Sequence, residues 1–266
     1  MITDDFAEIN HQLALSEGLY ELKDSFIRAR SEPQFSEVFQ QVTPLVSVCV
    51  ATYNRPVLLI KRCIASLLRQ TYRNIQIVVV GDHCTDDTEY TLAQIRDSRI
   101  TFENLPERGP YPRPGVNRWR VAGTYAMNRA LDLCEGSFIS HLDDDDEATP
   151  ERLEKLVRRA LEKRLEFIWH KFFYQLDGGV WSTLGGDELQ LNQVTTGSIF
   201  YHRFFSKIKW DVFAFRRQEP GDWNRIRKIQ FLEPYMEFLN EALTIHYQEF
   251  QQLEFTAQRD ESFLES

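Results

Sequence analysis

The feature that most constrains the fold is a short, mainly apolar run over residues 138–142 that ends in four consecutive aspartates, Asp143 to Asp146. A run bounded in this way is typical of a buried strand, and open α/β sheets bind ligands at the edge where their strands end. Thr149 and Pro150 then favour the start of a helix, as a cap and as a first helical residue. Adjacent carboxylates repel one another, and such hard oxygen ligands suit Mg²⁺ or Mn²⁺. A solvated acidic loop is the alternative, but the position directly after a strand favours a metal site.

Length and charge limit the classes of protein. The 266 residues, 42% of them hydrophobic, suffice for one large α/β domain with or without appendages. The net charge of −9 offers no overall surface for a polyanion, so we expect no nucleic-acid partner. No apolar run approaches the roughly 18 residues of a membrane span, and the N-terminus lacks a signal region. These features predict a soluble, cytoplasmic protein without a transmembrane segment.

A strand, a helix and a second strand follow one another in the central part of the sequence. Residues 45–50 form an almost continuous apolar run, typical of a parallel strand that is buried on both faces. Pro56 favours the start of a helix, and residues 75–80 supply a second apolar strand. This spacing predicts a right-handed crossover in a parallel sheet. A short third strand is predicted around Ile100 and Phe102.

Two segments flank this central pattern. Residues 1–42 contain an approximate helical stripe of apolar side chains, which ends near Pro33. We expect this helical extension to pack on the main domain, with binding of a partner as the alternative. Residues 231–266 mix polar and apolar side chains and are expected to be partly helical and to pack on the domain. The main domain is therefore placed at residues 43–230.

Four motifs in a consistent order carry a resemblance to a known family. They are Val46 to Asn54, Gly81 to Asp86, Ala126 to Asn128 and Leu142 to Pro150. Together they resemble the signatures of family 2 glycosyltransferases, over roughly residues 44–228. The resemblance implies a GT-A fold, in which a mostly parallel nucleotide-binding sheet is flanked by helices.

The resemblance also implies an activity. A divalent cation, Mn²⁺ or Mg²⁺, would assist the transfer of a sugar from a nucleotide-sugar donor to an acceptor hydroxyl. The acceptor would be a glycan, a lipid-linked sugar or a small molecule. The protein would then work in the cytoplasm or at the membrane periphery.

Site residues at the ends of the predicted strands follow from the same resemblance. Positions that match Ala51, Tyr53 and Asp82 lie around the nucleoside in the family, with Asp82 placed to accept a hydrogen bond from the base. A simple turn residue is the alternative for Asp82. Arg118 and Arg120 are candidates for charge-assisted hydrogen bonds to the diphosphate, with plain surface charges as the alternative.

The metal ligands are expected among the aspartates. Asp143 and Asp145 match the family's metal-binding D-x-D motif, with Asp145 as the direct ligand. The cation would neutralise charge on the departing diphosphate. Asp144 is assigned to the nucleotide. Asp144 and Asp146 would orient water or the ribose, with plain solvation as the alternative. His246 is a further candidate ligand, although a lone histidine is more often structural.

The catalytic base is expected in the second half of the chain. Glu219 to Trp223 resemble the family's late acidic motif, with Asp222 at the position of the base. Asp222 would take the acceptor's proton as the acceptor oxygen attacks the anomeric carbon in line, and this single displacement predicts inversion of configuration. Glu219 is the fallback, and a helix cap is the alternative role for Asp222.

Four features depart from the family pattern. Gly81 stands where the family often has an aspartate, His83-Cys84 replaces a usual Gly-Ser, and Met127 stands where many members have arginine. These three differences bear on the identity of the donor more than on the fold. Gly221 precedes the predicted base where glutamate is common, and this difference bears on the base.

Two other functional classes stay open. A nucleotidyltransferase would need a loop rich in glycine and basic residues after the first strand, whereas residues 51–56 contain only Arg55. A non-catalytic module that binds a nucleotide-sugar or a glycan would lack the metal carboxylates or the base. Asp143, Asp145 and Asp222 are all present, which favours the transferase.

Overall fold

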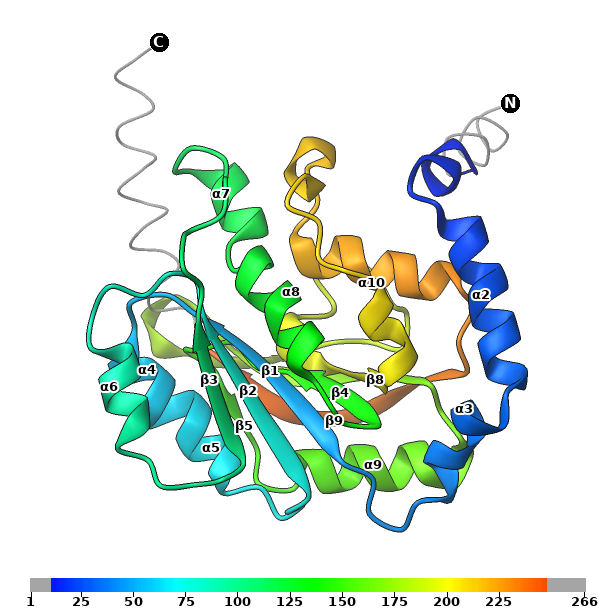
Figure 1. Ribbon diagram of the computed structural model, residues 1–266, viewed down its shortest axis with the longest axis horizontal. Coiled ribbons are helices and arrows are strands. Elements are labelled where there is room, and N and C mark those ends of the chain that lie inside the picture. The colour runs from blue at the N-terminus through cyan, green and yellow to red at the C-terminus, as the bar shows by residue number, and fades with distance from the viewer. Residues whose placement is uncertain (1–10, 248–266) are drawn as a thin grey trace.

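A nine-stranded sheet lies at the centre of the protein in a computed structural model that describes residues 11–247 (Figure 1). The strand order in this part of the chain is β3-β2-β1-β4-β8-β6-β9-β5, and β7 pairs with β6. The strands are β1 (Val46–Thr52), β2 (Ile75–Gly81), β3 (Ile100–Asn104), β4 (Phe138–His141), β5 (Glu147–Ala148), β6 (Phe167–Gln175), β7 (Trp181–Leu184), β8 (Ile199–His202) and β9 (Met236–His246). Helices cover both faces of the sheet.

Strands β3, β2, β1 and β4 form a parallel half of the sheet, as the apolar runs predict. Val46 at the start of β1 lies opposite Ile75 of β2 and Phe138 of β4. Almost every residue of β1 and β2 is buried, because helices cover both faces and leave no alternation between apolar and polar side chains. The carboxyl ends of these strands therefore meet at one edge.

Alternate side chains of β1 belong to two separate cores. Val46, Val48 and Val50 pack against one layer of helices, and Cys49 packs against the other. The first layer holds α6 (Thr88–Ala93), α9 (Arg152–Lys163) and a continuous helix made of α4 (Pro56–Leu58), the π-helical η2 (Leu59–Ile64) and α5 (Ala65–Leu68). The second layer holds α2 (Leu19–Ser31), α8 (Thr124–Leu133) and α10 (Gly221–Phe231).

The other half of the sheet is mixed. Strand β8 is antiparallel to both β4 and β6, whereas β6 and β9 are parallel. The expected helical content after residue 231 is wrong for the described part, because residues 236–246 form the long strand β9. Polar residues such as Glu237 and Glu241 lie on this strand and bind α9 side chains, Arg159 and Lys155 among them, which obscures the alternation expected of a strand.

The N-terminal helices pack on the main domain, as predicted for the described part of residues 1–42. Phe26 of α2 is fully buried, and its ring lies 5.1 Å from the rings of Phe204 and Phe205. Phe35 of α3 (Pro33–Glu37) continues this contact, and burial of two such rings stabilises the arrangement by about 2 to 3 kcal/mol each. No helix within residues 11–247 is both long and apolar enough to cross a membrane.

Candidate active site

A cavity of about 960 Å³ opens at the carboxyl ends of β1, β2 and β4. Its walls come from the loops that follow these strands, from α7 (Val116–Val121) and from the first turn of α10. All nine residues that the sequence assigns to the site line this cavity, namely Ala51, Tyr53, Asp82, Arg118, Arg120, Asp143, Asp144, Asp145 and Asp222. The fold thus brings the predicted residues together, and their individual roles stay predictions.

The aspartate turn, residues 143–146, is held from the loop that follows β1. The Thr52 hydroxyl donates a hydrogen bond of 2.7 Å to Asp144. The Arg55 guanidinium lies 3.1 Å from a carboxylate oxygen of Asp145 and 3.8 Å from one of Asp144. Burial and the neighbouring Asp145 raise the pKa of Asp144 to about 7, although Arg55 and Thr52 oppose the shift. The turn therefore carries more negative charge than its protein partners neutralise.

A candidate cation site lies at one side of the aspartate turn. Asp143, Asp146 and His246 each offer one ligand atom, and these atoms all lie within 4.8 Å of one another. His246 Nδ1 is 2.8 Å from Asp146, which is fully buried. Burial alone would lower the pKa of His246, but Asp146 together with Asp143 and Asp145 raises it to about 9. Burial and the carboxylates of Asp146 and Asp145 raise the pKa of Asp143.

This donor set fits a divalent cation such as Mn²⁺ or Mg²⁺, because its two carboxylates are the oxygen ligands that these ions prefer. The His246 imidazole would add a nitrogen ligand after loss of its proton. The set differs from the predicted ligand pair. Asp143 belongs to both, whereas Asp145 lies against Arg55 instead of in the group with His246. Sequence reasoning gave His246 little weight, since nothing before the structure showed that β9 ends beside the aspartates.

Asp82 and Tyr53 lie together at another part of the cavity. Arg108 connects them, because its Nε is 3.3 Å from Asp82 and its guanidinium stacks 3.5 Å from the centre of the Tyr53 ring. Burial raises the pKa of Asp82, although Tyr111 and Arg108 oppose the shift. Asp82 Oδ1 is buried and has no hydrogen-bond partner within residues 11–247. This oxygen can accept a hydrogen bond from a ligand. Arg108 was not among the site residues predicted from the sequence.

The departure at Gly81 has a structural explanation. A Cβ atom at this position would lie only 2.5 Å from Asn104 Oδ1 and 3.0 Å from Cys84 Sγ. Asn104 instead accepts a hydrogen bond of 2.8 Å from the backbone N–H of Cys84 and so holds the loop after β2. The side chain of Asn104 in β3 therefore occupies the space that an aspartate at position 81 would need.

Both predicted diphosphate-binding arginines line the cavity, but each also holds its own loop. Arg118 Nε donates to the carbonyl of Pro112 at 2.8 Å, and Arg120 donates to Asn117 at 3.3 Å. Arg55 forms an ion pair with Asp145 of the aspartate turn, whereas the contacts of Arg118 and Arg120 given above lie within their own loop and helix. It is a further candidate for the diphosphate, which the sequence reasoning did not propose.

Asp222 lies in the first turn of α10 and faces the cavity. Its Oδ1 accepts a hydrogen bond of 2.7 Å from the backbone N–H of Trp223, so it also contributes to the helix start. Burial raises the pKa of Asp222, which makes the carboxylate a better proton acceptor. Glu219, the fallback base, is instead bound by Arg227 at 2.7 Å and by Asn224 at 2.5 Å. Asp222 is therefore the better candidate of the two.

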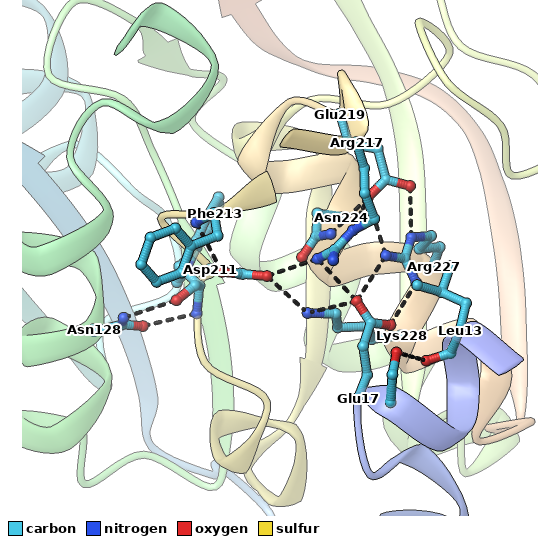
Figure 2. Close-up of polar contacts among 12 residues, drawn as sticks. Leu13, Glu17, Asn128, Asp211, Phe213, Arg217, Glu219, Asn224, Arg227 and Lys228 are labelled. Atoms are coloured by element: carbon cyan, nitrogen blue, oxygen red, sulfur yellow. Dashed lines mark hydrogen bonds and ion pairs between the residues drawn. The ribbon is translucent and has the colours of Figure 1, made fainter. Parts of the chain in front are cut away.

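A network of ion pairs holds α10 in place (Figure 2). We call it the Glu17 network, and its members are Glu17, Asp211, Arg217, Glu219, Arg227 and Lys228. Both terminal nitrogens of Arg227 lie 2.9 Å from the Glu17 carboxylate, and Arg217 is equally close. Burial alone would raise the pKa of Glu17, but Arg227, Lys228 and Arg217 lower it.

A family model described as "Glycosyl transferase family 2" matches residues 47–218. The chain belongs to glycosyltransferase family 2. This result confirms the resemblance. The aspartate turn and most of the residues that line the cavity lie within the matched segment, whereas Asp222 and His246 lie beyond it. Asn128, from one of the four motifs, now has a structural explanation. Its side chain bonds both the N–H and the carbonyl of Trp210, a cavity residue, at 2.8 and 3.0 Å.

Two bacterial glycosyltransferases are similar to this family 2 chain in sequence. WcaA of Escherichia coli (strain K12) is 31% identical over 182 residues, which are 66% of this chain and 59% of WcaA. The GalNAc(5)-diNAcBac-PP-undecaprenol beta-1,3-glucosyltransferase of Campylobacter jejuni is 30% identical over 170 residues, 64% of this chain and 52% of that protein. This chain therefore spans less than two thirds of the length of these relatives.

A solved structure supports the fold assignment. The crystal structure of TarS 1-349 from S. aureus in complex with UDP-GlcNAc matches with a TM-score of 0.61 and 20% sequence identity. The match covers 76% of this chain and 58% of that one. The GT-A-like fold that the sequence predicts is thereby confirmed, with its mixed sheet and flanking helices.

Proposed function

We propose that this protein is a metal-dependent, inverting glycosyltransferase that uses a nucleoside-diphosphate sugar as donor. The observation that carries the proposal is the cavity itself, which is lined by Asp82, by Asp143 to Asp145 of the aspartate turn and by Asp222. These three features offer a hydrogen-bond acceptor, a cluster of uncompensated carboxylates and a carboxylate with a raised pKa. The first would bind the nucleobase, the second would hold the cation of the diphosphate, and the third would accept the proton of the acceptor hydroxyl.

UDP is the preferred nucleotide in this proposal. Two relatives support it, since an Escherichia coli relative is named a UDP-Glc:alpha-D-GlcNAc-diphosphoundecaprenol beta-1,3-glucosyltransferase and the TarS structure contains UDP-GlcNAc. Asp82 Oδ1 would accept the N–H of the uracil, and Tyr53 would stack on it beside Arg108. A Mn²⁺ or Mg²⁺ ion held by Asp143, Asp146 and His246 would neutralise charge on the diphosphate when bound.

The chain's own residues then perform the transfer. Asp222 accepts the proton of the acceptor hydroxyl, while the acceptor oxygen forms a bond to the anomeric carbon. The bond from that carbon to the diphosphate oxygen breaks on the opposite side, and the electron pair leaves with the nucleoside diphosphate. Arg55 stabilises the negative charge of this leaving group. One displacement inverts the anomeric configuration.

The acceptor class proposed is a sugar on a polyprenyl diphosphate, because the names of two relatives contain such a lipid. The protein would then act at the periphery of a membrane. The test is incubation of the protein with Mn²⁺, a polyprenyl-diphosphate sugar and either UDP-glucose or UDP-GlcNAc. The expected result is release of UDP and a product whose anomeric configuration is opposite to that of the donor, as the coupling of the anomeric proton shows in NMR. A product that retains the donor configuration would contradict the single displacement, and absence of transfer from every donor would contradict the proposal.

A further inference from the structure

The rim of the cavity carries a face that is both apolar and basic. We call it the α7 face, and it consists of Arg113, Val116, Trp119, Phe213 and Arg216. Val116, Trp119 and Phe213 are 40%, 47% and 51% exposed, which is unusual for large apolar side chains that lie so near one another. Val116 and Trp119 lie one turn apart on α7, so they share a side of that helix.

The two parts of this face come from segments far apart in the sequence. The short helix η6 (Ala214–Arg217) packs beside α7, and both project from the same edge of the molecule in Figure 1. Phe213 directly precedes η6, and the Arg216 guanidinium lies 4.4 Å from the centre of its ring. Arg113 is exposed in the loop before α7. The apolar groups are thus accompanied by arginines on both sides.

The charge of this region is opposite to that of the whole chain. The net charge is −9, yet residues 108–131 contain five arginines and neither aspartate nor glutamate. The adjoining segment 203–217 contains five basic residues and one acidic residue, Asp211. Four of these basic residues are already paired with carboxylates, namely Arg108, Arg129, Lys209 and Arg217. Arg113 and Arg216 form no ion pair within residues 11–247, so they remain available to attract a negatively charged surface to this edge.

We propose that the α7 face docks on a bilayer that contains anionic phospholipids. Arginines bind lipid phosphates, and tryptophan, phenylalanine and valine enter the boundary between head groups and acyl chains. A soluble polyanion would be attracted by the arginines but would leave Val116 and Phe213 in water. Trp119 also lines the cavity, so the docked face continues directly into the proposed acceptor entrance. A lipid-anchored hydroxyl could reach Asp222 without leaving the membrane, and this last role rests on the proposed function.

Vesicle binding of the full chain tests the proposal. The protein is sedimented with vesicles of phosphatidylcholine alone or of phosphatidylcholine mixed with phosphatidylglycerol. We expect binding to the mixed vesicles only, with a decrease as salt rises. The variant R113Q/R216Q should bind about 25-fold more weakly, since each arginine near an anionic surface contributes about fivefold. The variant V116S/F213S should lose at least half of the binding that remains at high salt.

Matched controls lie on other surfaces. Arg96 and Arg158 are exposed arginines, and Val42 and Tyr90 are 90% and 69% exposed. The variants R96Q/R158Q and V42S/Y90S should bind vesicles like the wild type. Absence of wild-type binding to mixed vesicles would overturn the proposal. An arginine effect without any effect of V116S/F213S would also overturn it and would assign the face to a soluble polyanion.

The test separates this inference from the proposed function. Arg113, Val116, Phe213 and Arg216 do not line the cavity, so UDP binding in solution should be unchanged in both α7-face variants. If UDP fails to bind the wild type while vesicles bind as expected, the glycosyltransferase proposal fails and the docking face stands. If UDP binds and transfer to a vesicle-embedded acceptor is unaffected in R113Q/R216Q, the docking role fails.

Discussion

Two clusters of carboxylates in this protein have opposite electrostatics. In the aspartate turn, burial and mutual repulsion raise the pKa of Asp143, Asp144 and Asp145. In the Glu17 network, three basic side chains overcome the effect of burial and lower the pKa of Glu17. The network pairs three carboxylates with three cations, whereas the four aspartates have Arg55 and His246 beside them.

The difference indicates what each cluster does. A balanced network away from the cavity stabilises the fold, because every charge has a partner and nothing remains for a ligand. An unbalanced cluster that lines a cavity is costly in the free protein and becomes favourable when a cation arrives. The contrast supports the proposal that the Glu17 network stabilises the fold and that the aspartate turn binds a cation.

The largest effect is expected for Asp222→Asn. The amide cannot accept the acceptor's proton, so kcat should fall by about 10²- to 10⁴-fold while UDP affinity changes little. Steady-state release of UDP and calorimetry measure the two quantities. Glu219→Gln is the matched control, since it changes the fallback base in the Glu17 network. A greater loss of kcat in E219Q than in D222N would reassign the base.

The next effect concerns the cation. Asp146→Asn should weaken Mn²⁺ binding by about 10- to 100-fold, because it removes one ligand and the hydrogen-bond partner of His246. The unbound Mn²⁺ signal in electron paramagnetic resonance reports this affinity directly. Asp145→Asn distinguishes the two assignments, since the sequence makes Asp145 the direct ligand and the geometry favours Asp146. A larger loss in D145N would support the sequence assignment.

Much of the fold was predictable from apolar runs. Strands β1 and β2 are buried on both faces, and such strands have a continuous pattern that a sequence reveals. Strand β9 was not predictable in this way, because Glu237 and Glu241 bind side chains of α9 and interrupt the pattern. Its position decides where His246 lies.

The site was predictable where its residues lie at the ends of predicted strands. Asp82 directly follows β2 and Asp143 lies two residues after β4, so their place at the sheet edge follows from the parallel order. Arg108 lies in a loop between β3 and α7, where no periodicity indicates the direction of a side chain. Its contact with Asp82 depends on long-range packing, and only the structure reveals it.

Removal of a charge from the Glu17 network should affect stability more than activity. Glu17→Gln leaves Arg227, Arg217 and Lys228 with one carboxylate fewer, at a side chain that is 9% exposed. We expect a decrease of about 2 to 3 kcal/mol in the free energy of unfolding. Urea unfolding measures it, with the exposed Glu21→Gln as a control that should stay within about 0.5 kcal/mol. Equal stability of E17Q and the wild type would contradict the structural role.

The smallest predicted effect is a pH dependence of opposite sign in the two clusters. His246 has a raised pKa of about 9, so its contribution to stability is complete below about pH 6.5 and is lost as pH rises through 9. Glu17 has a lowered pKa, so its contribution is present above about pH 4.5 and is lost as pH falls.

Urea unfolding in the presence of a chelator tests this difference. Between pH 6 and 9 the wild type should lose about 1 to 2 kcal/mol relative to His246→Ala. Saturating Mn²⁺ should reverse the trend, because His246 must release its proton to act as a ligand. Parallel pH profiles of the wild type and H246A without metal would show that the pair with Asp146 has no such role.

Calorimetric titration of UDP into the metal-free protein, and into the same protein with Mn²⁺, tests the central claim most directly. UDP binding should strengthen at least tenfold with Mn²⁺, because the cation relieves the repulsion between the diphosphate and the aspartate turn. The enhancement should disappear in Asp146→Asn and persist in Glu17→Gln. Equal UDP affinity with and without Mn²⁺ in the wild type would contradict the claim that the aspartate turn is a cation site for the donor.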